Sequence, residues 1–145
     1  MGDHVRDTIR FRSLRRYKYQ LRRAYTVDTP IRLPSSVATH GGFVCMTADG
    51  GLTMAAGYAW DGPSGPTVDT PSFMRGSLVH DGLYQLIREG LIGMEHRKAA
   101  DQLLREHCRQ DGMGRLRAAY VYRAVRWFGA KHAKPRPVPD DQVAP

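Results

Sequence analysis

One histidine and three aspartates lie where they could form a hydrolytic site. His80 and Asp81 are neighbours within an apolar helical pattern, and Asp101 falls in the helical pattern that follows. A carboxylate that orients a histidine makes the imidazole a general base, and a second carboxylate beside it can bind a hard cation. We therefore predict that His80 activates water and that Asp101 fixes its tautomer. Asp81, with Asp61 or with carbonyl groups of the loop W-D-G-P-S-G, is predicted to bind a cation such as Ca²⁺.

The expected helix boundaries bring these side chains together. One helix is predicted over residues 71–89 and a second over about 95–110. With a rise of 1.5 Å per residue, His80 lies roughly 13 Å from the turn between the helices and Asp101 roughly 9 Å. Two helices that fold back on each other pack about 8–10 Å apart, so the imidazole and the carboxylate can meet across the seam.

Four residues are predicted to line a substrate pocket beside the imidazole. Helical side chains lean toward the helix N-terminus, so the ring of His80 is directed over two small residues, Gly76 and Ser77. These residues are expected to leave open space in front of the ring. Tyr84 continues the same face of the helix, and Trp60, which precedes the loop rich in glycine and proline, completes the set.

Each of these features also has a purely structural interpretation. His80 and Asp81 could form a polar pair at a helix–sheet boundary, with Asp101 present to satisfy the imidazole. Asp61 and the glycine after it could form an ordinary turn. His107 lies near the apolar stripe of the second helix and is predicted to be a core residue and not a ligand. The sequence leaves the catalytic and the structural interpretations open.

The N-terminal half is predicted to be β-structure. Alternating apolar residues over 17–27 indicate a half-buried strand, and two β-prone runs around Asp49-Gly50 indicate a hairpin. Residues 61–71 have the composition of a loop. Thr70 is suited to cap the first helix, because a proline occupies the first helical position after it.

The third helix, predicted over about residues 115–130, is amphipathic. Arginines occupy one side, and the apolar side comprises Leu116, Tyr120, Ala124, Trp127 and Phe128. Strands followed by helices predict an α+β domain. We expect a small N-terminal antiparallel sheet with a hairpin and then three α-helices, of which the first two carry the site.

The chain is predicted to have a basic arm over 1–16, a single α+β domain over 17–131 and a proline-rich extended tail over 132–145. The net charge of +8 indicates an acidic partner such as nucleic acid, a membrane surface or an acidic protein. No apolar run approaches the ~20 residues of a membrane helix, and an N-terminus without an apolar run argues against export. Cys45 and Cys108 share no C-x-x-C spacing and are predicted to be buried thiols of a reducing compartment.

The motifs of residues 25–128 resemble those of a family of uncharacterised proteins encoded by phages and prophages. They are G-Y-A-W-D-G-P-S-G-P, L-V-H-D-G-L-Y and R-K-A-A-D. The resemblance implies a phage or prophage origin, synthesis in the bacterial cytoplasm and, for a structural component, association with the virion. It implies no particular reaction.

A second resemblance is confined to the helix pair. H-D-x-x-Y, followed by an aspartate twenty-one residues after the histidine, is similar to the catalytic helices of secreted phospholipases A2, most nearly the small bacterial and fungal kind. In those enzymes the histidine is the base, the next aspartate binds Ca²⁺ and the later aspartate supports the histidine. The resemblance implies these roles for His80, Asp81 and Asp101, and it places Asp61 where the calcium loop precedes the helix.

Three functions are consistent with these patterns. The first is metal-assisted hydrolysis of esters, with membrane lipid as the substrate. The second is a non-catalytic virion component of the tail, neck or baseplate, in contact with other phage structural proteins. The third is a nucleic-acid-binding accessory protein that acts through the basic arm.

Overall fold

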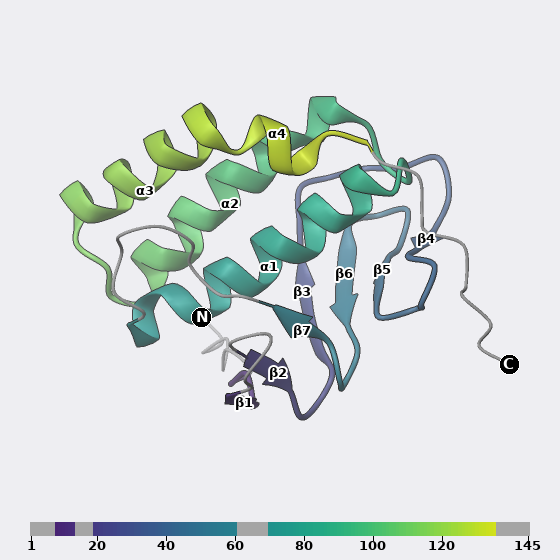
Figure 1. Cartoon of the computed structure of the whole chain (residues 1–145), viewed down its shortest axis with the longest axis horizontal. Helices are drawn as coiled ribbons and strands as arrows, with labels where there is room; N and C mark the ends of the chain where they lie inside the picture. Colours follow the sequence, from purple (N-terminus) through teal and green to yellow (C-terminus); the bar gives the residue numbers. More distant parts are fainter. Residues whose placement is uncertain (1–7, 14–18, 61–69, 136–145) are drawn as a thin grey trace, which may run out of the picture.

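The structure, a computed structural model, describes residues 8–13, 19–60 and 70–135. Small antiparallel sheets are followed by helices, which confirms the predicted α+β class (Figure 1). The described strands are β1 (Phe11–Ser13), β2 (Tyr19–Leu21), β3 (Tyr25–Asp28), β4 (Val37–Ala38), β5 (Val44–Met46), β6 (Gly51–Met54) and β7 (Ala59–Trp60). The described helices are α1 (Pro71–Arg88), the 3-10 helix η1 (Met94–His96), α2 (Arg97–Gln110), α3 (Arg115–Phe128) and α4 (Ala130–Ala133).

The prediction of one strand over residues 17–27 is wrong, because the described part of this range forms two strands in different sheets. β2 lies between β1 and β7, whereas β3 is at the edge of the sheet ordered β3-β6-β5-β4. Three exposed residues, 22–24, separate the buried side chains of Leu21 and Tyr25. These two side chains are four positions apart, so the alternating pattern of apolar residues continues across the break. The pattern therefore gives no sign that the strand ends.

Both predicted end segments contribute to the folded part of the chain. Within the predicted arm, β1 pairs with β2 and places Phe11 opposite Leu21. The ring of Phe11 lies 5.2 Å from that of Tyr19 and 5.9 Å from that of Trp60, measured between centroids. At the other end, α4 includes Ala133, which is fully buried although it was predicted to lie in the extended tail.

The hairpin predicted around Asp49-Gly50 is confirmed. β5 and β6 pair in the antiparallel sense on either side of this turn. Gly50 has a φ of +98°, and a Cβ at this position would lie 2.5 Å from the carbonyl oxygens of Thr29 and Ile31. The turn therefore requires glycine here, for both its conformation and its packing.

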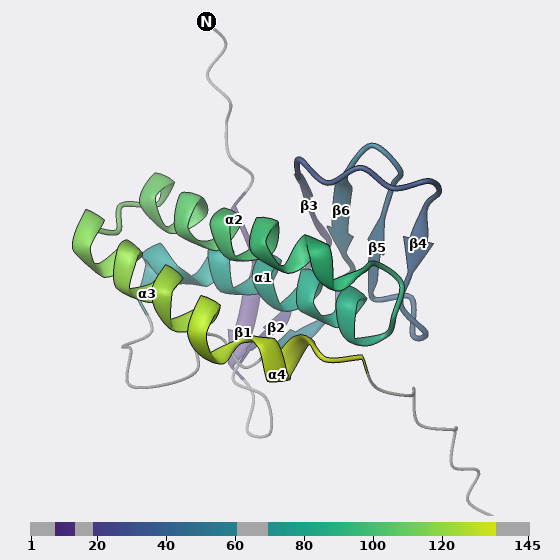
Figure 2. The ribbon, with the colours of Figure 1, turned by 90° about the horizontal axis from the view of Figure 1, so that it is seen from above.

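The three long helices lie close to their predicted ranges. α1 begins at Pro71, after Thr70 in the N-cap position, although the Thr70 side chain makes no capping hydrogen bond. The second predicted helix begins as the 3-10 turn η1 before α2, and Gly129 separates α3 from the short α4. α1 and α2 lie side by side (Figure 2).

α1 is the centre of the core, because both the sheet and α2 approach it closely. A Cβ at Gly82 would lie 3.0 Å from Sδ of Met54 in β6, and a Cβ at Gly76 would lie 3.0 Å from Sγ of Cys108 in α2. Between these contacts the helix buries large apolar side chains such as Leu78 completely. Each such side chain contributes roughly 1.5–3 kcal/mol of transfer free energy.

The apolar side predicted for the third helix does not face the core. Ala118 and Val121 are buried, whereas Leu116 is 89% exposed and Trp127 is 81% exposed. Among the other apolar residues of that side, Tyr120 and Phe128 are exposed and Ala124 is half-buried. α3 takes this orientation because it packs through small side chains and because its Arg126 pairs with the buried Asp101.

Among the described residues, none of the helices combines the length and the apolar character needed to cross a bilayer. Cys45 and Cys108 are both free thiols. Cys108 is fully buried as predicted, whereas Cys45 is half-buried. Burial raises the pKa of the Cys108 thiol to about 12, so this group stays protonated.

Candidate active site

α1 presents His80 and Tyr84 on one side, one helical turn apart. Residues four positions apart in a helix are neighbours on its surface. The centroids of the two rings are 4.1 Å apart, and their planes are tilted by 38°. His80 retains 8% of its exposure, and Tyr84 retains 3%. Packing along α1 therefore fixes the position of the imidazole.

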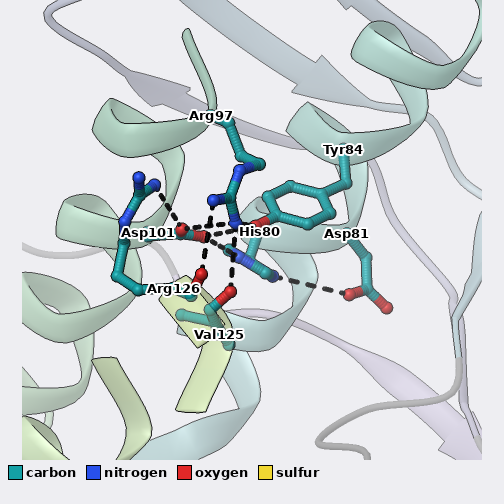
Figure 3. Close-up of polar contacts among 7 residues, drawn as sticks. All are labelled: His80, Asp81, Tyr84, Arg97, Asp101, Val125 and Arg126. Carbon is teal, nitrogen blue, oxygen red and sulfur yellow. Dashed lines mark hydrogen bonds and ion pairs between the residues drawn. The ribbon is translucent and has the colours of Figure 1, made fainter. Parts of the chain in front are cut away.

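α2 runs back along α1 and brings Asp101 to His80, as predicted. Nε2 of His80 lies 2.7 Å from Oδ1 of Asp101, which is a short hydrogen bond (Figure 3). Asp101 is 0% exposed. The two residues therefore meet inside the helix pair, and the carboxylate has no contact with bulk water.

The Asp101 carboxylate also accepts hydrogen bonds from three side chains for which we made no such prediction. The hydroxyl of Tyr84 donates to Oδ1 at 2.6 Å. Nη1 of Arg126 donates to Oδ2 at 2.9 Å, and Nη1 of Arg97 lies 3.5 Å from the same oxygen. The carboxylate therefore joins α1, α2 and α3 (Figure 3).

The contacts of the two arginines with Asp101 differ in how well the sequence predicts them. Arg97 lies four residues before Asp101 on the same helix, and this spacing is a recognisable signal for an ion pair. Arg97 also donates to the backbone carbonyls of Val125 and Arg126, at 3.1 and 3.3 Å. These carbonyls lie in the last turn of α3, and the carbonyl of Val125 also accepts a hydrogen bond from the backbone N–H of Gly129 at 2.8 Å. Arg126 itself reaches Asp101 from another helix, and no spacing rule connects the two.

Asp101 is ionised at neutral pH despite its burial. Burial alone would raise the pKa of its carboxyl group, but hydrogen bonds from His80, Tyr84 and Arg126 outweigh this effect and hold the pKa below its usual value. Burial raises the pKa of Tyr84, and so does the adjacent carboxylate of Asp101. The Tyr84 hydroxyl therefore keeps its proton and acts as a donor.

The ionised carboxylate sets the tautomer of His80. A carboxylate can only accept hydrogen bonds, so Nε2 carries the proton in the contact with Asp101, and Nδ1 of the neutral ring holds the lone pair. Nδ1 is directed toward Asp81, whose Oδ1 lies 4.0 Å away (Figure 3). Nδ1 is therefore the ring atom that can accept a proton.

The open space predicted over Gly76 and Ser77 is not present. A Cβ at Gly76 would lie 3.0 Å from both Leu104 and Cys108, so side chains of α2 fill this space. Ser77 is 3% exposed, and its hydroxyl accepts a hydrogen bond from the indole of Trp60 at 3.2 Å. Trp60 is itself buried. These three residues pack in the core, so the predicted open pocket is not seen beside them, and the hydroxyl of Tyr84 is directed to Asp101.

The cation site predicted at Asp81 and Asp61 is described in part. Asp81 lies on α1 with 35% of its side chain exposed, and Asp61 lies outside the described residues. Ca²⁺ takes about six to eight oxygen ligands. Within residues 8–13, 19–60 and 70–135, no group of three or more His, Cys, Asp or Glu side chains is placed to hold a metal ion. The described residues therefore supply one predicted ligand, and calcium stays a prediction.

Comparison of the chain with models of protein families, with curated proteins and with solved structures found no match. The resemblances to the phage family and to phospholipases A2 therefore stay predictions. Function is inferred below from the residues around His80 and Asp101.

Proposed function

We propose that the chain is a phage- or prophage-encoded hydrolase that cleaves ester bonds in lipids, with His80 as the general base. The main support is the 2.7 Å contact between Nε2 of His80 and the buried carboxylate of Asp101. With Nε2 protonated in this contact, the lone pair lies on Nδ1, next to the half-exposed Asp81. A base that activates water needs such a nitrogen, held in a fixed orientation.

In the proposed reaction, Nδ1 of His80 takes a proton from water while the water oxygen attacks the carbonyl carbon of the ester. The negative charge of Asp101 stabilises the imidazolium that forms. When the tetrahedral intermediate collapses, the imidazolium returns its proton to the departing alkoxide. The products are a carboxylic acid and an alcohol, and the ring is neutral again.

Asp101 is a positioning residue in this reaction, because it acts through His80. Its carboxylate is fixed by Tyr84 at 2.6 Å and by Arg126 at 2.9 Å, so it can hold the imidazole at one angle and in one tautomer. Removing its charge should therefore change the pH dependence of turnover and not only its rate.

Calcium enters the proposal through Asp81. A bound Ca²⁺ would polarise the ester carbonyl and stabilise the oxyanion. Its remaining ligands would come from Asp61 and the loop around it, which lie outside the described residues. Loss of turnover in a chelator, and recovery on adding Ca²⁺, tests this part separately from the role of His80.

The experiment is turnover by the purified full chain on a panel of fatty-acid esters and phospholipids, with Ca²⁺ and with a chelator. Wild-type protein should release acid from at least one substrate. His80→Ala should lower turnover by about 10²–10⁴-fold, because the base is lost. His132→Ala, which removes an exposed histidine of α4, is the matched control and should retain activity.

Two results would contradict this proposal. One is the absence of wild-type turnover across the whole panel, with and without Ca²⁺. The other is a His80→Ala variant that remains folded, as shown by circular dichroism, and retains wild-type activity. Asp101→Asn should shift the pH profile of any turnover that remains, which a purely structural role would not do.

A non-catalytic virion component is the second candidate. It is favoured by the way Asp101 ties three helices together, since such a cluster can serve structure alone. It predicts that the protein is found in purified particles by mass spectrometry, bound to other phage structural proteins. Absence from particles would exclude this candidate.

Binding of nucleic acid through the basic arm is the third candidate. Arg10 and Arg12, in and beside β1, are exposed and favour it. Such binding should weaken steeply with rising salt and fall after removal of residues 1–16. No binding at low salt would exclude it.

A further inference from the structure

We propose that the outer side of α3, formed by Leu116, Tyr120, Arg123 and Trp127, is a docking surface for an anionic lipid bilayer. This inference rests on the proposed function for its choice of lipid as the partner. It extends that function by naming the element that would bring the chain to its substrate.

The large side chains of α3 point away from the protein. On a helix with 3.6 residues per turn, positions 116, 120, 123 and 127 fall within about 60° of one another and span about 16 Å. Leu116 is 89% exposed, Tyr120 is 55% exposed and Trp127 is 81% exposed. Exposed apolar residues that are clustered, and not scattered singly, mark contact surfaces.

The side of α3 that faces the protein is built from smaller residues. Ala118 is 0% exposed and Val121 is 3% exposed, and Val125 packs against the same cluster. These positions lie opposite the outer side on the helical wheel. α3 therefore has two apolar sides, and the protein covers the one with the smaller side chains.

Charge on and beside the outer side selects the partner. Residues 115–135 contain four arginines, two lysines and no aspartate or glutamate. Arg115, Arg123, Lys131 and Lys134 are among the exposed residues of this stretch. A helix with tryptophan and leucine on one face and flanking cations lies in the plane of an anionic bilayer, with its apolar side chains in the headgroup region. The long basic side chains can then reach lipid phosphates.

Two other partners fit these observations less well. A second copy of the chain would bring the cations of two α3 helices together, and residues 115–135 hold no acidic side chain to offset the repulsion. Nucleic acid would pair with the cations, but it would leave the aliphatic Leu116 in water. A bilayer satisfies both the apolar side chains and the cations.

The docking surface is directly connected to the candidate site. Arg126, which precedes Trp127, pairs with Asp101 at 2.9 Å. At the end of α3, a Cβ on Gly129 would lie 2.6 Å from the hydroxyl of Tyr84, so the backbone packs against the residue that donates to Asp101. Docking through α3 would therefore hold the helix pair against the bilayer through the segment 126–129.

The test is co-sedimentation of the full chain with vesicles of phosphatidylglycerol and phosphatidylcholine, compared with phosphatidylcholine alone. The His80→Ala variant is used, so that hydrolysis cannot alter the vesicles. It should bind the anionic vesicles and lose this binding at high salt. Adding Leu116→Ala and Trp127→Ala together, or Arg123→Glu alone, should weaken binding by about tenfold or more. Phe43→Ala, at a 44% exposed aromatic residue of the sheet region, is the matched control and should bind normally.

Several outcomes would overturn the proposal. One is no binding of the chain to anionic vesicles, and another is unchanged binding by the α3 variants. A third is that no form of the protein binds vesicles, whereas the α3 substitutions abolish binding to DNA or self-association. The two proposals can also fail separately. Vesicle binding with no turnover on any ester would support the docking surface and contradict the proposed hydrolase activity. Turnover of soluble esters without vesicle binding would support the hydrolase activity and contradict the docking surface.

Discussion

α2 and α3 are adjacent helices of 14 residues each, and both have an amphipathic sequence, yet they use their apolar sides differently. α2 buries its apolar residues, including Leu103 at 6% and Leu104 at 2% exposure. α3 exposes Leu116 and Trp127 and packs through smaller residues. Helical periodicity thus identifies an apolar side, but it does not say whether the protein or an external partner covers that side.

Each helix also places one side chain in an environment that is unusual for its residue type. Asp101 is charged and lies on the buried side of α2, whereas Trp127 is aromatic and lies on the exposed side of α3. A buried charge costs free energy unless it is paired, and a large exposed apolar cluster is uncommon on a protein surface. Both features therefore indicate a function or a binding partner. Arg126, next to Trp127, connects them by its ion pair with Asp101.

The largest difference in unfolding free energy should be between the removal of one charge from α2 and the removal of one charge from α3. Asp101→Ala leaves His80 and two arginines without their shared partner and should lower the free energy of unfolding by about 3–5 kcal/mol. Arg123→Ala, on the outer side of α3, should change it by less than about 0.5 kcal/mol. Urea unfolding followed by circular dichroism measures both. Equal effects would mean that the Asp101 cluster does not hold the helices together.

Two leucines provide the next comparison. Leu104→Ala removes a side chain that is 2% exposed and should cost about 2–5 kcal/mol of unfolding free energy. Leu116→Ala, at 89% exposure, should stay within about 0.5 kcal/mol. The same unfolding assay applies. A large loss for Leu116→Ala would show that the outer side of α3 is covered within the protein itself.

A smaller effect than those of the two substitutions above should come from pH. Between about pH 6.5 and 4, the dependence of stability on pH should arise mainly from His107 of α2. Burial and, to a smaller extent, the positive charge of Arg75 lower the pKa of His107 to about 4, although Asp111 opposes them. Its Nδ1 is buried and lacks a hydrogen-bond partner among the described residues. The unfolded chain binds a proton near the usual pKa of 6.5 and the folded chain does so near 4, so stability should fall as pH drops from about 6.5 to 4.

The difference between those two pKa values corresponds to at most about 3 kcal/mol. Unfolding midpoints recorded across this pH range should therefore depend on pH in the wild type and depend less on pH in His107→Phe. Because the pKa of Asp101 is also lowered, part of the acid sensitivity should remain in that variant below about pH 4. A variant that keeps the whole dependence between pH 6.5 and 4 would contradict the assignment to His107.

The fold class and the contact between His80 and Asp101 could be predicted because both depend on local patterns. Helix lengths and a short turn determine which residues lie at the same level of a helix pair. The contact of Arg126 with Asp101 could not be predicted, since it depends on how a third helix packs. The filled space at Gly76 was missed for a related reason: a small residue permits either an open pocket or the close approach of another helix.

The central claim, that Nδ1 of His80 is the basic nitrogen, can be tested by NMR of protein labelled with ¹⁵N in its histidines. Long-range ¹H–¹⁵N spectra at neutral pH, assigned with the His80→Ala variant, distinguish the two ring nitrogens. We predict a proton on Nε2, bonded to Asp101, and a bare Nδ1. A neutral ring with its proton on Nδ1 would contradict the account, because that nitrogen could not then accept a proton from water.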